Sequence, residues 1–202
     1  MMCYSIEAAL KASCFSRVIV STDSIMYGKI ALDAGAEVIY RGENVSNDTA
    51  TTFMVLEDLF KKIETSFDYF VLLQPTSPMR NSCHIIEAVN LFESRCDTFD
   101  FLVSMKEAEH SGVLVKPIEE DLSLKHFDAD FANYRRQAYK DYTPNGAIFI
   151  GKPNEYMKQK HFFGEKALAY IMSAVDSVDV DTELDYKFAE ICMRNITDGT
   201  ER

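Results

Sequence analysis

Residues 69–80 read YFVLLQPTSPMR, an apolar run that stops abruptly at Gln74 and is followed by two prolines, two hydroxyl side chains and Arg80. A short unbroken apolar run bounded by turn residues is typical of a strand that is buried on both faces. A single proline or polar residue is enough to end a strand in a loop. This stretch instead contains an amide, two hydroxyls and a guanidinium. The sequence therefore predicts a buried strand over residues 68–74 that ends at a pocket, with Gln74 as the first polar wall.

Short apolar runs alternate with helical periodicity on both sides of this stretch. Further strands are predicted over residues 17–21, 36–41, 99–107, 111–118, 146–150 and 168–172. Helices are predicted around Ile6 and Leu10, over 24–34 and 49–63, after an N-cap at Asn81 or Ser82 with Ile85, Val89 and Phe92 inward, and over 182–193 with Leu184, Phe188, Ile191 and Cys192 on one face. This order predicts an α/β fold with a Rossmann-like, mostly parallel sheet and flanking helices. Ligands in such sheets lie beyond the carboxyl ends of the strands.

Composition limits the classes of partner. The 202 residues are expected to form a single domain, with about residues 101–145 as an arm or insertion within it. A net charge of −11 argues against nucleic acid or an anionic membrane as a partner. The five cysteines are odd in number and widely spaced, which favours a reducing, cytoplasmic setting.

The segment SVDVDTELD, residues 177–185, is the strongest candidate for chemistry. If residues 177–181 form a strand, Asp179 and Asp181 point to the same face. Two neighbouring carboxylates repel each other unless a cation lies between them, and Mg²⁺ prefers oxygen ligands from carboxylates and phosphates. The alternative is that Asp181 or Thr182 caps the last helix and Asp179 is solvated. The spacing alone does not separate these interpretations.

Three further patterns have simple structural explanations. Arg135 and Arg136 could bind a carboxylate or phosphate, but a solvated surface pair is the favoured interpretation. Asn145 and the glycine after it indicate a tight turn before a strand. Phe162 and Phe163 precede another strand, where paired aromatic residues usually belong to the core.

Five motifs in this order resemble one known family. They are LLQPTSPMR at 72–80, RRQ at 135–137, PNGAIFI at 144–150, FFGEKALAYIM at 162–172 and SVDVDTELDYKFAE at 177–190. The chain resembles the acylneuraminate cytidylyltransferases, also called CMP-sialic acid synthetases. The resemblance implies a nucleotide-binding domain that holds CTP and Mg²⁺. In that reaction the anomeric hydroxyl of a nine-carbon keto-sugar acid attacks the α-phosphate, and pyrophosphate leaves.

The resemblance also implies a role for each matching position. The metal carboxylates fall on Asp179 and Asp181. The residues implied to contact the sugar acid are Gln74, Thr76, Arg135, Arg136, Gln137, Asn145, Phe162 and Phe163. Arg41 and Thr52 match positions that are implied to lie on the nucleotide-binding side of the site. The irregular middle of the chain resembles an arm that forms a homodimer, or a dimer of dimers, and helps to complete the neighbouring site.

One departure from the family concerns the start of the chain. Family members begin with a strand and a phosphate-binding loop, whereas this sequence begins at the helix expected to follow them. We therefore expect an N-terminally truncated cytidylyltransferase with an open edge or gap in its sheet. The alternatives are a non-catalytic remnant that binds sugar and dimerises, and, with less support, a metal-dependent glycosyltransferase. The motifs do not name the sugar acid.

Overall fold

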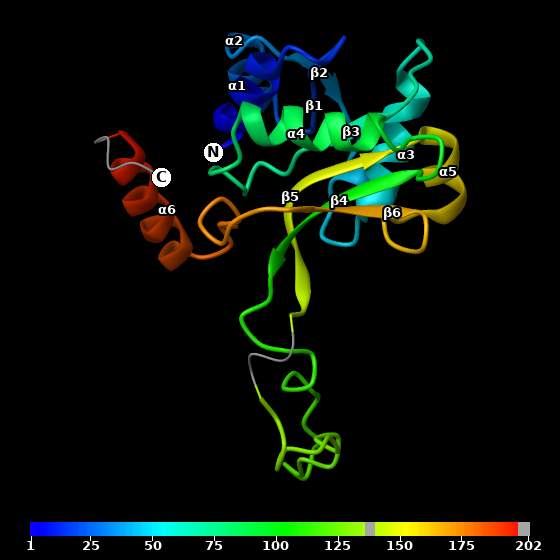
Figure 1. Cartoon of the computed structure of the whole chain (residues 1–202). Helices are drawn as coiled ribbons and strands as arrows, with labels where there is room; N and C mark the ends of the chain where they lie inside the picture. Colours follow the sequence, from blue (N-terminus) through cyan, green and yellow to red (C-terminus); the bar gives the residue numbers. More distant parts are fainter. Residues whose placement is uncertain (136–139, 198–202) are drawn as a thin grey trace.

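A four-stranded sheet and a separate pair of strands form the centre of the molecule, and helices cover them (Figure 1). The computed structural model describes residues 1–135 and 140–197. The helices are α1 (Met2–Ala12), α2 (Ile25–Asp33), η1 (Glu43–Val45), α3 (Thr52–Lys62), α4 (Ser82–Glu93), α5 (Pro153–Gln159) and α6 (Glu183–Thr197). The strands are β1 (Ile19–Thr22), β2 (Glu37–Tyr40), β3 (Phe70–Leu72), β4 (Phe101–Glu107), β5 (Tyr142–Gly151) and β6 (Ala167–Ile171).

The α/β class is confirmed, but strand pairing is mixed rather than mostly parallel. Strands β1 and β2 pair in parallel, and the larger sheet has the order β3-β5-β4-β6. Strand β5 runs antiparallel to both β3 and β4, while β4 and β6 are parallel. The reason is that β4 and β5 are connected by the arm and not by a crossover helix, so the chain returns in the opposite direction.

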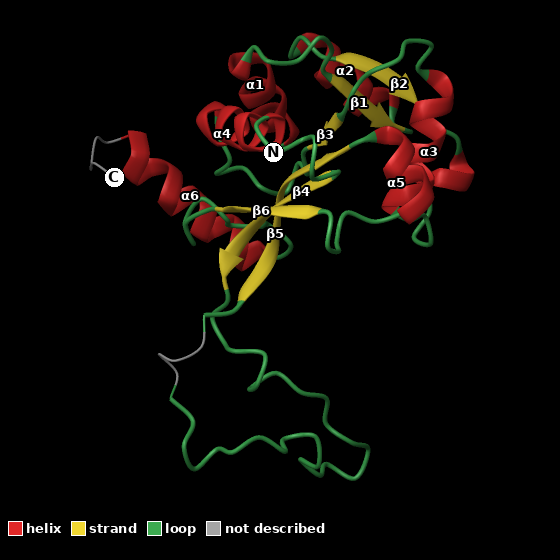
Figure 2. Cartoon of the chain, turned by 45° about the vertical axis from the view of Figure 1, so that its right-hand side comes forward, coloured by secondary structure: helices red, strands yellow, loops and turns green. Residues whose placement is uncertain are grey.

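Alternating side chains of the sheet serve two cores. Leu102 and Ile148 point to one face and pack against α1 and α4, where Ile85 and Phe92 are fully buried. Phe101 points to the opposite face, toward α3 and α5. Successive strand residues face opposite sides of the sheet, so both faces carry apolar side chains. Helices cover both of these faces. Figure 2 shows α1 and α4 on one side and α3 and α5 on the other.

Helix α4 begins as the sequence predicts. The Asn81 side chain accepts hydrogen bonds from the backbone N–H groups of Cys83 and His84, and the His84 ring accepts one from the Asn81 N–H. This reciprocal arrangement satisfies donors that a helix start would otherwise leave unpaired. Ile85, Val89 and Phe92 form the buried face, as expected.

The arm differs from its predicted limits and content. Residues 108–135 extend away from the body as irregular chain (Figure 1), whereas 101–107 and 142–151 are strands of the sheet. The strand predicted over 111–118 is wrong, because no described strand pairs with that segment and Val115 and Ile118 are exposed. Its apolar residues therefore lie on the surface of the arm.

Helix α6 also buries a different face from the predicted one. Ala189 and Cys192 pack against Met79, Val178 and Val180. By contrast, Leu184 is 75% exposed, and Phe188 and Ile191 are also exposed. The helix contacts only one small cluster, so only a narrow stripe is buried. Within the described residues, no helix combines the length and apolarity that a membrane span requires.

We expect Leu102→Ala to lower the free energy of unfolding by about 2–5 kcal/mol, because Leu102 is fully buried between the sheet and α4. Leu184→Ala is the matched control, and its effect should stay within about 0.5 kcal/mol because the side chain is exposed. Urea unfolding of both variants measures the difference. Equal losses of stability would contradict the core assignment.

Candidate active site

A pocket of about 390 Å³ lies where the arm leaves the sheet. The end of β4, the start of β5 and the extended segment after β6 form its walls. The residues that line it are Lys106, Glu109, Thr143, Pro144, Asn145, Gly146, Ser177 and Asp179. The pocket thus gathers charged and polar groups from three segments that lie far apart in the sequence.

Gly146 brings Gln74 and Asp179 together. Its φ is +76°, a left-handed conformation that favours glycine. A Cβ at this position would collide with Oε1 of Gln74 and would lie 3.5 Å from Oδ2 of Asp179. The missing side chain therefore lets an amide and a carboxylate approach the same point of β5. Gln74, predicted as the first polar wall, approaches Gly146 but is not among the residues that line the pocket, so its role as a wall stays a prediction.

A buried arginine holds the loop that carries Gln74. Arg80 is only 2% exposed, and its guanidinium donates to the Ala147 carbonyl at 3.2 Å and to the Ser5 hydroxyl at 2.6 Å. The Gln74 carbonyl accepts from Ser5 at 3.3 Å and from Arg80 at 3.4 Å. Burial lowers the pKa of Arg80 to about 10, so the group stays protonated at neutral pH. Its charge is stabilised by these three neutral oxygens.

The same loop is attached to the acidic segment. The Val180 N–H donates to the Thr76 carbonyl at 2.8 Å. The backbone of Thr76 therefore lies beside the segment that carries Asp179. Thr76 is not among the residues that line the pocket, so its contact with substrate stays a prediction.

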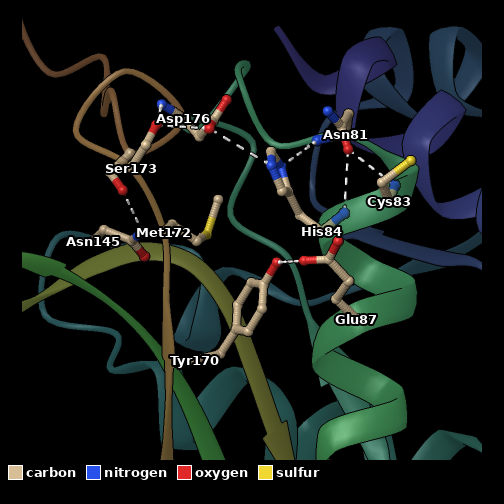
Figure 3. Close-up of polar contacts among 10 residues, drawn as sticks. Asn81, Cys83, His84, Glu87, Asn145, Tyr170, Met172, Ser173 and Asp176 are labelled. Atoms are coloured by element: carbon tan, nitrogen blue, oxygen red, sulfur yellow. Dashed lines mark hydrogen bonds and ion pairs between the residues drawn. The ribbon is translucent and has the colours of Figure 1, made fainter. Parts of the chain in front are cut away.

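Asn145 lines the pocket and lies next to Met172 (Figure 3). Its side-chain oxygen accepts from the Ser104 hydroxyl at 2.5 Å and from the Ala147 N–H at 3.1 Å. Its amide nitrogen donates to the Ser177 hydroxyl at 2.8 Å and to the Met172 sulfur at 3.3 Å. Asn145 is 4% exposed and uses both ends of its amide internally. The structure therefore gives it a positioning role, while its contact with substrate stays a prediction.

The turn after β6 is anchored to α4. The Ser173 hydroxyl donates to the Asp176 carboxylate at 2.7 Å, and Nε2 of His84 lies 3.7 Å from that carboxylate (Figure 3). One helix turn later, the Tyr170 hydroxyl donates to Glu87 at 2.5 Å. Burial, and then the hydrogen bond to Glu87, raises the pKa of Tyr170, so its proton stays in place. These contacts hold the turn that leads to Asp179.

Asp179 and Asp181 differ in their surroundings. The strand considered over residues 177–181 is absent, since Ser177 lies in a turn and residues 178–181 are irregular chain. Val178 and Val180 are buried, Asp179 is half-buried and Asp181 is exposed. The alternation predicted from the sequence is thus present, although no neighbouring strand enforces it.

Thr182 rather than Asp181 caps helix α6. The Thr182 hydroxyl accepts from the Asp185 N–H at 3.3 Å, and the Asp185 carboxylate accepts from the Thr182 N–H at 2.8 Å. The hydrogen bonds from Thr182 lower the pKa of Asp185. This reciprocal cap leaves the Asp181 carboxylate available for other contacts.

The acidic pair fits a cation that is shared with a ligand. Oδ1 of Asp179 is buried and has no hydrogen-bond partner among the described residues. An unpaired buried carboxylate oxygen is costly, and a cation would satisfy it. Across residues 1–135 and 140–197, no three His, Cys, Asp or Glu side chains are grouped to hold a metal ion. Mg²⁺ commonly completes its shell with water and substrate phosphate, so two carboxylates are sufficient protein ligands.

The two residues matched to the nucleotide side lie in another part of the fold. The Arg41 guanidinium donates to the Ser21 carbonyl at 3.2 Å and to the Ser46 hydroxyl at 3.1 Å. Thr52 is the first residue of α3, and its neighbour Thr51 supplies the N-cap. Neither Arg41 nor Thr52 lines the pocket. The structure thus brings Arg41 to the end of β1 but does not join it to Asp179.

The aromatic pair is divided between core and surface. Phe162 is buried among Phe101, Phe149 and Tyr156, with its ring centroid 4.7 Å from that of Tyr156. The structure therefore places Phe162 in the core, because the aromatic residues of α5 and the sheet surround it. Phe163 is 46% exposed.

The basic residues of the arm are only partly described. Arg135 is exposed in the arm, whereas Arg136 and Gln137 lie outside the described residues. The Arg135 side chain is not among those that line the pocket of its own chain. Its predicted contact with a sugar carboxylate therefore stays a prediction.

Several site residues carried little signal in the sequence. Lys106 lines the pocket and Ser104 supports it, but both belong to a segment that is predicted as an ordinary strand. Ser177 lies in the acidic segment, in which the pattern indicates chemistry only at the aspartates. Arg80 follows a proline-rich loop, where a surface position would be expected for arginine. Strand register could have indicated Lys106 and Thr143, since they are cross-strand partners, but register requires the pairing to be known.

We expect Gly146→Ala to lower the free energy of unfolding by about 1–3 kcal/mol, because a left-handed alanine is strained and its Cβ displaces Gln74. Urea unfolding provides the measurement. The double variant Gly146→Ala with Gln74→Ala should lose less stability than the sum of the single variants, since the collision is gone.

Gly112→Ala is the control for this prediction. A Cβ on Gly112 would approach no atom closer than 3.9 Å, so the expected change is within about 0.5 kcal/mol. A Gly146→Ala protein as stable as the wild type would show that the close approach of Gln74 is unimportant.

Comparisons with known proteins show the family of the chain. The sequence model of the Cytidylyltransferase family matches residues 1–191. The chain is 40% identical to the N-acylneuraminate cytidylyltransferase of Escherichia coli over 189 residues, which cover 94% of this chain and 45% of that protein. It is 29% identical to the CMP-N,N'-diacetyllegionaminic acid synthase of Legionella pneumophila, covering 96% of this chain and 84% of that protein.

A solved structure also shares the fold. CMP:2-keto-3-deoxy-manno-octonic acid synthetase, determined in complex with CTP, superposes with a TM-score of 0.68 at 14% identity. The match covers 96% of this chain and 87% of that one. The chain spans about half the length of the Escherichia coli relative, at 45%. Because the family model extends over nearly the whole sequence, the chain belongs to the cytidylyltransferase family.

Proposed function

We propose that this protein activates a nine-carbon keto-sugar acid of the sialic acid type with CTP, giving the CMP-sugar and pyrophosphate. The observation that supports the proposal is that Gln74 and Asp179 both approach Gly146, a residue that lines the pocket together with Asp179. These residues belong to three of the motifs that resemble acylneuraminate cytidylyltransferases. The names of the relatives support the reaction class, since they describe cytidylyltransferases and CMP-sugar synthases.

In this proposal the residues of the pocket mainly position the substrates. Gln74 offers an amide that can hydrogen-bond the hydroxyl and acyl groups of the sugar. Asp179 and Asp181 supply negative charge at the edge of the same site. In-line phosphorus transfer requires little covalent chemistry from the protein, so alignment and charge neutralisation supply most of the rate.

We further propose Mg²⁺ as the cofactor, held by Asp179 and Asp181. The assignment is supported by the buried Oδ1 of Asp179, which has no partner within residues 1–135 and 140–197, and by the Asp181 carboxylate, which is not used in the cap of α6. When bound, such an ion neutralises charge on the phosphates of CTP. Asp179 then contributes a fixed oxygen because the Ser177 and Thr76 contacts restrain its segment.

The names of the relatives indicate a class of sugar acid and not one compound. The relatives are named for acylneuraminate and for diacetyllegionaminate, two acids that share a carboxylate and an anomeric hydroxyl. We propose that this protein accepts an acid of that shape. The five free cysteines support a reducing, cytoplasmic setting as part of the proposal.

We expect Asp179→Asn to reduce CMP-sugar formation by at least about 100-fold, because the loss of a metal carboxylate removes several kcal/mol of charge stabilisation. The measurement is release of pyrophosphate from CTP with N-acetylneuraminic acid and Mg²⁺. Chelation of divalent ions should abolish the wild-type rate.

Asp97→Asn is the matched control, since Asp97 is exposed beyond the end of α4. Its rate should equal that of the wild type. Normal turnover by Asp179→Asn would remove the metal assignment. Binding of the sugar acid without any binding of CTP would instead favour the non-catalytic alternative.

We also propose that the arm forms a homodimer. Its exposed apolar residues are Val115, Ile118, Leu122, Leu124 and Phe131. An extended segment with this many exposed apolar side chains is typical of an interaction surface. In a homodimer, an arm that extends away from the body could contact the second chain.

Sedimentation analysis should therefore give the mass of two chains for the wild type. Leu122→Glu combined with Leu124→Glu should shift the equilibrium toward the monomer, because the buried glutamates would be unpaired. Leu32→Glu, on the exposed surface of α2, should leave the mass unchanged. A monomeric wild type would contradict the proposal.

A further inference from the structure

We infer that Lys106 binds the carboxylate of the sugar acid, together with the hydroxyl of Thr143. This inference rests on the proposed function. It assigns the anionic group of the substrate to a residue of the pocket in the same chain, in addition to the basic residues expected from the arm.

Lys106 points into the pocket from β4. Ser104, two residues earlier on that strand, contacts Asn145 in the pocket lining, and Lys106 lines the pocket near the same asparagine. The β4–β5 register shifts between Val103 and Met105, so the orientation of Lys106 rests on its place in the pocket lining, opposite its cross-strand partner Thr143. The lysine therefore lies on the face that carries the candidate site.

Lys106 is the only cation among the described residues that line the pocket. The charged groups around it are the carboxylates of Glu109 and Asp179. Its ammonium makes no ion pair and no hydrogen bond with any residue in the described part of the chain, whereas Lys62 and Lys152 elsewhere are paired with carboxylates. A lysine that has no partner within a polar pocket is available to an anionic ligand.

Thr143 supplies a second donor beside the lysine. Lys106 and Thr143 are directly opposite each other in the β4–β5 ladder, and both line the pocket. Cross-strand partners have Cβ atoms about 4.5–5.5 Å apart, so an ammonium and a hydroxyl can reach the two oxygens of one carboxylate. The Thr143 hydroxyl has no hydrogen-bond partner among the described residues.

The charge of the pair matches a single carboxylate better than a triphosphate. One ammonium balances one negative charge, while a triphosphate requires several cations or a metal ion. The acidic pair at Asp179 and Asp181 is the part of the site suited to a metal and its phosphates. Lys106 then keeps the carboxylate of the sugar from being repelled by Asp179.

The test compares Lys106→Met, Lys106→Arg and a control, Lys29→Met, in the complete chain. Lys29 is exposed on α2 and has no ion-pair partner in the described structure. Titration calorimetry measures binding of N-acetylneuraminic acid and of its methyl ester, and steady-state kinetics give separate KM values for the sugar acid and CTP. Thermal unfolding confirms that each variant is folded.

For Lys106→Met we expect the Kd and KM of the sugar acid to rise about 10- to 100-fold, the range for loss of a charge-assisted hydrogen bond. The KM of CTP should be unchanged. Lys106→Arg and Lys29→Met should bind the acid nearly as the wild type does. The methyl ester should bind weakly to the wild type and equally weakly to Lys106→Met, because the group that the lysine recognises is masked.

Unchanged binding of the acid by Lys106→Met would overturn the inference, as would a rise in the KM of CTP alone, which would assign the lysine to phosphate. A wild type that binds no sugar acid would also overturn it. A wild type that binds the acid in a Lys106-dependent way but forms no CMP-sugar would leave the inference intact and refute the proposed reaction.

Discussion

The buried amide of Asn145 is the contact on which the rest of the site depends. It joins Ser104 of β4, the backbone of β5 and Ser177 of the segment that leads to Asp179. A polar group so deeply buried is tolerated only when its donors and acceptors are satisfied, and here both ends of the amide are used. The network thereby specifies one arrangement of three segments around the pocket.

The site also depends on a position that has no side chain, Gly146. Gly146 allows Gln74 and Asp179 to approach the same point of the backbone, and its positive φ makes any other residue strained. Arg80 holds the Gln74 loop from behind through buried hydrogen bonds to carbonyl oxygens. The polar side chains of the pocket thus rest on a rigid support, which favours the precise alignment that transfer at phosphorus requires.

The charged side chains of the site suit two different kinds of ligand group. Asp179 has a buried oxygen with no hydrogen-bond partner in the described part of the chain, which suits a cation and the phosphates that accompany it. Lys106 lines the same pocket, and its ammonium has no partner among the described residues, which suits a carboxylate. In a protein with a net charge of −11, such local positive charge matters, because the overall field repels anionic ligands.

The sequence by itself determined the α/β class, the presence of a strand before Gln74 although it ends at Leu72, the cap at Asn81, the inward face of α4 and the burial of Val178 and Val180 on either side of Asp179. These features are local: periodicity records which side is buried, and turn and cap residues record where an element ends. Only the tertiary structure decided that β5 runs antiparallel to its neighbours, that Phe162 belongs to the core and that Thr182 rather than Asp181 caps α6. It also decided that Lys106 faces the pocket. Each of these depends on partners distant in the sequence, and such partners are chosen when the chain packs.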